Sequence, residues 1–415
     1  MLTFVENVSL VKEDSNIHRA VTACHKYHNH REPYKEIFCF FPWIRGIAHT
    51  PQEYSYAYGG TEVMRQQLLG KRSLSYECVI MNGKYEDSLS YLPESVEVFP
   101  YKEALESFAT FMQRLRVEEH PLAFVNAESS QDGVVIYIPD GKVIDEQIFV
   151  HHIIYPVARG NLLFSPKVIV VFGREACAAV HVFHHIEVDC RTVVREMMVN
   201  GVTEVFVSEK AEAIISIDPR YAHESQFSWS HIATIQAGGA CAVVHHLLED
   251  ARSYGLFENT FYLMGDYAHA ESVVAARSPR KTWVRNLMHH DAKHTTSQQK
   301  IRSVLDSGEF LFEGGIKITP QGEYANAYQR HDTLLLDDQA RVSTYPRLEI
   351  LTDEVKASHG ATVGSMDEKL LFYMRSRGLP LKLARERLVQ GFLKSLTPTP
   401  ETFPRLSKVF KGLYF

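Results

Sequence analysis

The chain has 415 residues, of which 45% are hydrophobic and 23% charged, and its formal net charge is −6 at pH 7. This length is too great for one ordinary core, and the composition excludes a disordered chain. The longest apolar runs fall far short of the roughly 20 residues that span a bilayer, and the N-terminal residues lack the pattern of a signal peptide. We therefore expect a folded cytoplasmic protein with no membrane contact, built from two or three units or from one elongated unit.

Residues 1–118 are predicted to form a partly helical N-terminal region. Thr61 can cap a segment that ends at Gly70, and residues 104–115 carry apolar side chains at helical spacing.

Residues 119–364 are predicted to form an all-β body, because many short strands follow one another there and convincing long helices are scarce. The β-branched runs cover residues 134–138, 143–150, 167–172, 178–183, 204–207, 213–217, 231–235, 240–244, 310–312, 316–318, 333–336 and 347–350. The pattern alone leaves a sandwich or a barrel open. The absence of a short repeat excludes a regular hexapeptide solenoid, while an irregular parallel β-helix fits the length and the missing period.

Residues 365–415 return to helix. Ser365 and Glu368 form a Ser-x-x-Glu capping box ahead of the first helical run. Gly378 stands where a helix-ending glycine belongs, and Pro380 fits the start of the second run. The second run places on one stripe Leu381, Ala384, Leu388 and Phe392. This pattern predicts a helical hairpin with an apolar seam.

Positive charge gathers in residues 369–415, which hold ten Lys or Arg against two Glu. A basic patch can bind nucleic acid or steer an acidic protein partner, although most such helices are solvated faces. Apolar seam positions account for Tyr373 and Phe392, so we expect no nucleic-acid partner.

The chain has 21 histidines and lacks the P-loop, dinucleotide-binding, nucleophile-elbow and H-E-x-x-H motifs. Three histidine clusters occur, at residues 24–30, 181–189 and 289–294. In the second cluster one strand face would carry His181, His185, Glu187 and Asp189. Each cluster could ligate a transition metal. None has an established distant partner, so the simpler interpretation is polar strand surface.

The segment 353–364, DEVKASHGATVG, alternates as a strand does, and one face carries Val355, Ala357, His359, Ala361 and Val363. A single histidine on an apolar face is more often a hydrogen-bonded core residue than a ligand. The small neighbours of His359 leave room around its imidazole for close backbone packing or for another chain.

A specific resemblance covers residues 312–379, which contain in order PRLEI, SHGATVG and LFYMRSRG, with QGF following at residues 390–392. These motifs resemble the SufB/SufD family of iron–sulfur cluster assembly and are closer to its SufD branch. Weaker similarity extends to residues 284–305 and 31–38. The sequence departs from the family at Ala357, where cysteine is usual.

The resemblance implies a right-handed parallel β-helix between N- and C-terminal helical regions. It also implies a non-catalytic scaffold that pairs with SufB through the C-terminal end of the β-helix and with the ATPase SufC through the C-terminal helices. A transient iron–sulfur cluster shared with SufB is the implied cofactor. Reduced flavin in the complex and a homodimer of the isolated chain are left open.

The position that matches the family's cluster-assembly histidine is His359. All six cysteines lie at or before Cys241, so this chain could offer an imidazole while the thiolate would come from a partner. The resemblance places SufC docking on residues 366–396, and the residues expected to take part are Leu370, Phe372, Tyr373, Arg375, Arg377, Gly378, Leu388 and Phe392.

The alternative from another class is a β-helix polysaccharide lyase or hydrolase. Such enzymes need an open groove lined by several carboxylates, and the strand runs contain no tight acidic cluster. Activity of the isolated chain on pectin-like polymers would favour this alternative.

Overall fold

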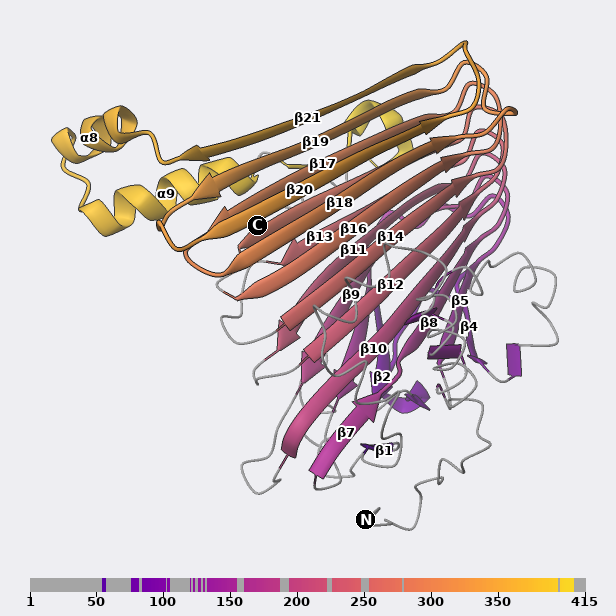
Figure 1. Cartoon of the computed structure of the whole chain (residues 1–415). Helices are drawn as coiled ribbons and strands as arrows, with labels where there is room; N and C mark the ends of the chain where they lie inside the picture. Colours follow the sequence, from indigo (N-terminus) through magenta and orange to yellow (C-terminus); the bar gives the residue numbers. More distant parts are fainter. Residues whose placement is uncertain are drawn as a thin grey trace.

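The computed structural model describes residues 54–56, 76–154, 160–186, 194–221, 226–247, 254–277, 280–394 and 396–406, with gaps at 82–83 and among 102–132. The described residues form a parallel β-solenoid of about 6 turns, with helices at its C-terminal end (Figure 1). The prediction of a mainly β, solenoid-type body is confirmed. No helix in the described part of the chain is long and apolar enough to cross a membrane.

From β8 onward the chain alternates between two sheets, so each coil there gives one strand to each sheet. The strands of the first sheet are β1 (Tyr54–Tyr56), β4 (Glu97–Pro100), β5 (Val134–Ile138), β7 (Gly160–Phe164), β8 (Lys167–Phe172), β10 (Val194–Val207), β12 (Gln226–Ile235), β14 (Tyr254–Leu263), β16 (Lys281–His290), β18 (Glu309–Ile318) and β20 (Arg341–Ile350). The strands of the second sheet are β2 (Tyr76–Met81), β3 (Lys84–Tyr85), β6 (Ile148–Ile154), β9 (Cys177–Ile186), β11 (Glu212–Tyr221), β13 (Ala240–Leu247), β15 (His269–Arg277), β17 (Thr296–Leu305), β19 (Asn326–Leu335) and β21 (Lys356–Ser365). Neighbouring strands are parallel except in the pairs β2–β3 and β4–β5.

Alternate side chains of the central strands point into the solenoid and form its core. Val205 and Val207 from one sheet meet Ile215 and Ile217 from the other in a single buried cluster. Parallel strands that are covered on both faces are buried almost throughout, as β8 is. The run KVIVVF is therefore apolar at consecutive positions instead of alternating.

The corners that lead from the first sheet to the second share a left-handed residue from Gly141 to Tyr324, and the last coil, β20–β21, has none. Non-glycine residues with positive φ recur at Glu175, Lys210, Tyr267, His294 and Tyr324, with φ between 55° and 63°. Each donates its backbone N–H across to the next corner, as Tyr267 does to the carbonyl of Lys293 at 3.0 Å. Left-handed backbone is disfavoured outside glycine, so these stacked hydrogen bonds fix the conformation of the corner.

The C-terminal helices are α8 (Glu368–Ser376) and α9 (Leu381–Lys394), followed by the 3₁₀ turns η4 (Pro400–Thr402) and η5 (Pro404–Leu406). The predicted capping box is wrong, because the Asp367 side chain accepts from the backbone of Lys369 and Leu370 while Ser365 ends β21. The predicted helix-ending glycine is confirmed, since Gly378 has φ +91°.

The buried face of α9 differs from the predicted stripe. Ala384, Val389 and Leu393 are buried, whereas Leu381 is 41% exposed. Val389 and Leu393 pack with Leu396, Phe403 and Leu406 against the outer face of the second sheet. The helix is rotated because it packs against the solenoid as well as against α8.

The runs predicted at residues 134–138 and 167–172 coincide with β5 and β8, and the run predicted at 143–150 begins before β6 does. Strands β14 to β17 were missed; in each of them polar residues interrupt the inward face, as Asn259 does in β14 and Gln299 does in β17. The helix predicted at residues 61–70 and almost all of that at 104–115 lie outside the described residues, and the described part of residues 1–118 contains β1 to β4. The domain boundaries stay predictions.

Candidate functional site

The last coil leaves the C-terminal end of the solenoid open. Among the described strands, β20 pairs only with β18, and β21 pairs only with β19. Each of these two ten-residue strands therefore presents one edge that no described strand covers. Such edges are ready-made templates for pairing with another chain.

Apolar side chains are exposed at this open end, because no further described coil covers the interior of the last one. β18 faces Phe312 and Ile316 inward, and their register partners in β20 are Thr344 and Leu348. Leu348 is 38% exposed and Val363, on the inward face of β21, is 53% exposed. The end of the core is thus an exposed apolar surface.

His359 lies on this surface, in β21, directly above Gln329 of β19 in the register. Gln329 is buried and faces inward, so His359 faces the interior as well, yet it is exposed. The interpretation of His359 as a hydrogen-bonded core residue is therefore wrong for this chain alone.

No described thiol is available beside His359. Cys78, Cys177 and Cys241 are free and buried. Burial raises the pKa of each of these thiols to about 12, and Glu212 contributes at Cys177. These cysteines are accordingly protonated at neutral pH and unsuited to binding a metal.

The histidine clusters are partly interior. His184 is buried with its ring centroid 3.7 Å from that of Trp229, and His290 is buried between the hydroxyls of Thr295 and Ser297, both at 2.8 Å. Polar strand surface is therefore the wrong interpretation for these two histidines. Within the described ranges no group of three or more His, Cys, Asp or Glu side chains could hold a metal ion. The cluster at residues 24–30 lies outside those ranges, as do Glu187 and Asp189.

The hairpin α8–α9 carries a second exposed apolar surface. Its large exposed side chains are Leu370 (44%), Phe372 (72%), Tyr373 (53%), Leu381 (41%) and Leu383 (41%). Arg375 and Gly378 are also exposed, and the guanidinium of Arg377 lies 5.2 Å from the ring centroid of Tyr373. Leu388 and Phe392 are half-buried, and Phe392 packs against the solenoid beneath Arg302. Of the predicted docking residues, those on α8 are thus the most accessible.

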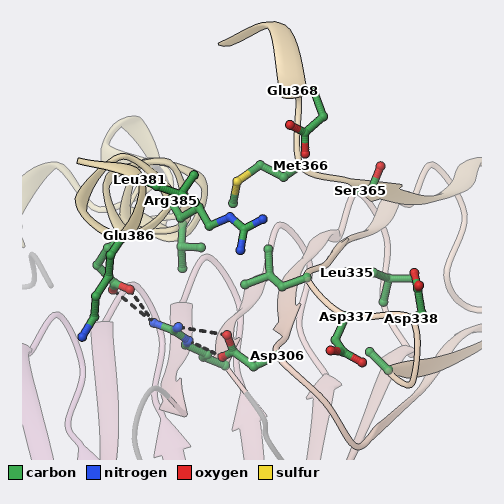
Figure 2. Close-up of a pocket in the computed structure, with 15 residues that line it drawn as sticks. Asp306, Leu335, Asp337, Asp338, Ser365, Met366, Glu368, Leu381, Arg385 and Glu386 are labelled. Carbon is green, nitrogen blue, oxygen red and sulfur yellow. Dashed lines mark hydrogen bonds and ion pairs between the residues drawn. The ribbon is translucent and has the colours of Figure 1, made fainter. Parts of the chain in front are cut away.

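A cavity of about 640 Å³ separates the start of α9 from the last coils (Figure 2). Arg277 spans one side of it. Its guanidinium donates to Asp306 at 2.6 and 3.1 Å and to both carboxylate oxygens of Glu386 at 3.1 Å. These bonds tie α9 to the β17–β18 corner on one side of the cavity, while Arg385 and Asp337 also line it.

The family match includes both exposed surfaces, the open end formed by β20 and β21 and nearly all of the hairpin α8–α9. The family described as "SUF system FeS cluster assembly, SufBD core domain" matches residues 157–392, more than half of the chain. The chain belongs to the SufBD family. This membership gives no support to the alternative of a polysaccharide lyase or hydrolase.

Several curated SufBD proteins are similar to this chain. The iron-sulfur cluster assembly protein SufD of Escherichia coli is 34% identical over 118 residues, which are 28% of this chain and 27% of that protein. The SufD of Bacillus subtilis is 26% identical over 291 residues, 67% of this chain and 63% of that protein. A SufBD family protein of Pyrococcus horikoshii is 23% identical over 351 residues, 81% of this chain and 74% of that protein. The aligned stretches cover less than two thirds of either SufD protein.

Sequence reasoning missed the apolar rim around His359. Leu348 and Ile350 share its surface, and both lie in β20, where Pro346 and the charged residues Arg347 and Glu349 obscure the alternation. The signal was present, since residues 342, 344, 346, 348 and 350 are uncharged in the sequence.

Proposed function

We propose that this SufBD family protein is a SufD-like, non-catalytic scaffold subunit that works with SufB and the ATPase SufC. In this proposal His359 supplies one donor to an iron–sulfur cluster assembled at the junction with SufB. The observation that carries it is the position of His359, which faces the interior of the solenoid and is exposed at its open end. A partner that covers this end would enclose His359 in a shared site.

The chemistry of this chain fits half of such a site. A neutral imidazole can replace thiolate at an iron–sulfur cluster. The described thiols are buried and protonated, and no cysteine follows Cys241, so in this proposal the remaining donors come from the partner; Cys24, Cys39 and Cys190 lie outside the described residues. The transient cluster is cargo of the complex and is not held by this chain alone.

The edges of β20 and β21 support the proposed SufB contact. Both strands end a solenoid whose exposed end is apolar at Leu348, Ile350 and Val363. Strand pairing would satisfy the free backbone groups, while apolar contact would bury the end of the core.

The exposed apolar residues of α8 support SufC docking on the hairpin. Phe372 and Tyr373 project from a helix with one buried residue, Leu371. Exposed aromatic side chains flanked by arginine are typical of the anchors of protein interfaces. ATP hydrolysis is assigned to SufC. Reduced flavin in the complex, a homodimer of the isolated chain and a cytoplasmic location stay predictions.

Replacing His359 by Ala tests the assembly site. We expect His359→Ala to lower iron–sulfur cluster formation by the reconstituted complex at least tenfold, because one donor is lost, while SufB and SufC still co-purify. The control is Thr362→Ala, on the opposite face of the same strand, which should leave cluster formation unchanged. Wild-type cluster formation by the His359 variant would refute the donor role.

Replacing Phe372 by Ser tests SufC docking. We expect at least a tenfold weaker affinity for SufC, measured by calorimetry, because a side chain that is 72% exposed is free to act as an anchor. Tyr267→Ser, at an exposed corner far from the hairpin, is the control. Deleting residues 366–415 is a poorer test, because it would also remove Val389, Leu393 and Phe403 from the core. Unchanged affinity of the Phe372 variant would contradict docking on α8.

A further inference from the structure

A file of polar side chains runs through the interior of the solenoid and ends at His359. Ser272, Gln299 and Gln329 occupy the same register position in β15, β17 and β19. The next position in this file, in β21, is His359. The three residues beneath it are at most 1% exposed, so they form a buried polar column.

Gln329 is the member of this file that lies directly beneath His359. Its Oε1 is buried and has no hydrogen-bond partner in the protein. Nearly all buried polar atoms in folded proteins are paired, so Gln329 Oε1 is an acceptor that is open to a donor from a neighbouring side chain. One rung below, Gln299 Oε1 is likewise unpaired, but the Gln299 amide is anchored through its Nε2, which donates to the carbonyl of Gly315 at 3.0 Å, and Gln299 lies one coil further from His359.

Gly314 provides the space for the Gln329 amide. A Cβ on Gly314 would lie 2.4 Å from Gln329 Oε1 and 2.5 Å from its Nε2, so any side chain there would displace the amide. Gln329 therefore extends across the interior of its coil at this height. His359 lies one coil above, and neighbouring strands in a sheet are about 4.8 Å apart. His359 is exposed and Gln329 Oε1 is unpaired in the structure; at that spacing a turn of the imidazole toward the interior would let a ring N–H reach Oε1.

We propose that Gln329 is a positioning residue for His359: its Oε1 accepts a hydrogen bond from one ring N–H and so leaves the lone pair of the other ring nitrogen aimed out of the open end. This inference rests on the proposed role of His359 as a cluster donor. Histidines that bind metal commonly donate their second ring N–H to an acceptor behind them, which fixes both the tautomer and the orientation of the ring. The amide oxygen beneath His359 supplies the acceptor that this arrangement requires.

The tautomer of His359 in the isolated full-length chain tests the proposal. With ¹⁵N-labelled histidine, the His359 resonances are identified by their loss in His359→Ala, and their shifts report which ring nitrogen carries the proton. We expect one tautomer in the unmodified chain and a mixture of both in Gln329→Leu, which removes the acceptor but keeps the side-chain size. The matched control is Gln299→Leu, one coil deeper in the same file, which should leave the tautomer of His359 unchanged.

A second variant keeps the proposal testable if Gln329→Leu does not fold. Gln329→Glu retains an acceptor at the same position, and we expect it to preserve the single tautomer. Mixed tautomers in folded Gln329→Glu, or an unchanged single tautomer in folded Gln329→Leu, would overturn the assignment. Circular dichroism establishes that each variant is folded.

Cluster formation by the reconstituted complex separates this inference from the proposed function. Loss of a group that supports a metal ligand usually costs 10- to 100-fold in affinity or activity. We expect a loss of that size for Gln329→Leu and none for Gln299→Leu. If His359→Ala has no effect on cluster formation while Gln329 still fixes the tautomer, the proposed function fails and the positioning contact stands. If cluster formation depends on His359 but not on Gln329, only the positioning role is wrong.

Discussion

Glu271 shows how a single buried side chain fastens the C-terminal segment to the solenoid. Its carboxylate accepts the backbone N–H of Thr399 at 3.0 and 3.2 Å, Lys300 Nζ at 2.9 Å and His269 Nε2 at 3.1 Å. Burial acts to raise the pKa of Glu271, but the hydrogen bond from His269 and the charge of Lys300 outweigh it and lower this pKa to about 2. The segment after α9 is therefore held by an ionised carboxylate.

Replacing Glu271 by Gln should destabilise the protein by about 3–5 kcal/mol, because it leaves Lys300 without its buried partner. Urea unfolding measures this loss. A matched control is Glu349→Gln, since Glu349 pairs with Lys317 at 2.9 Å on the surface and its loss should cost at most about 1 kcal/mol. Equal effects of the two substitutions would show that Glu271 does not hold the C-terminal segment.

The pH dependence of stability gives a second test of Glu271. A carboxylate with a lowered folded-state pKa stabilises the fold above its unfolded pKa, and this stabilisation is lost as the pH falls. The window for Glu271 runs from about pH 4.5 down to about pH 2. Glu271→Gln should therefore flatten the stability curve in this window by about 3 kcal/mol in total. Parallel curves for the two proteins would contradict an ionised Glu271.

At the scale of elements, the hairpin α8–α9 is attached to the solenoid unevenly. The second half of α9 is packed into the core through Val389 and Leu393, whereas the first half faces the 640 Å³ cavity. The Arg277–Glu386 pair bridges the body and that first half (Figure 2). Arg277 is 30% exposed, so its ion pair with Glu386 adds little to the free energy of unfolding. We expect its main effect to be on where the first half of α9 lies relative to the solenoid.

Replacing Arg277 by Met should accelerate amide hydrogen exchange in α8 and in residues 381–386, while changing the global free energy of unfolding by no more than about 1 kcal/mol. The ionic tie is lost but the aliphatic stem is retained. Lys293→Met is the control, since Lys293 pairs with Glu323 at a corner on another part of the solenoid. Unchanged exchange in the hairpin would mean that packing alone positions it.

The sequence predicted strands well where the apolar run is continuous and missed strands in which polar residues interrupt it. β5 and β8 coincide with apolar runs, but β17 turns Ser297, Gln299 and Ser303 inward and shows no apolar stripe. Only the register of stacked coils makes these positions interior. The helix cap failed for a local reason, because β21 continues through Ser365 and leaves Asp367 as the first free acceptor.

The sequence allowed the candidate residue His359 to be named, but not its exposure or its neighbours to be predicted. The motif SHGATVG singled out His359, whereas its exposure depends on β21 being the last strand of its sheet. Gln329 could not be found from the sequence, because it is thirty positions away from His359 and only the coil length aligns them.

At the scale of the whole molecule, buried neutral histidines make the solenoid sensitive to acid. Burial, with His245 and His184 nearby, holds the pKa of His231 well below 6.5. Burial also lowers the pKa of His290 to about 3 and that of His331 to about 4. Below pH 6.5 the unfolded chain takes up protons that the folded chain does not. The free energy of unfolding therefore decreases as the pH is lowered through this range.

We expect these histidines to give the free energy of unfolding a slope of roughly 1.4 kcal/mol per pH unit for each such group between about pH 6 and pH 5. His290→Gln, which keeps a polar group near Thr295 and Ser297, should reduce the slope by about one group's share. Chemical unfolding at several pH values measures it. A slope that does not change in this variant would mean that His290 is protonated in the folded protein.

The left-handed corners have a consequence for how this scaffold can change in length. Because successive coils from Gly141 to Tyr324 turn through the same kind of corner, a whole coil is the smallest piece that can be added or removed there without disturbing the strands on either side. Such a change would move the two ends of the molecule by about 4.8 Å and leave both end surfaces as they are. The distance between the N-terminal coils and the end that carries His359 can therefore change only in steps of one coil.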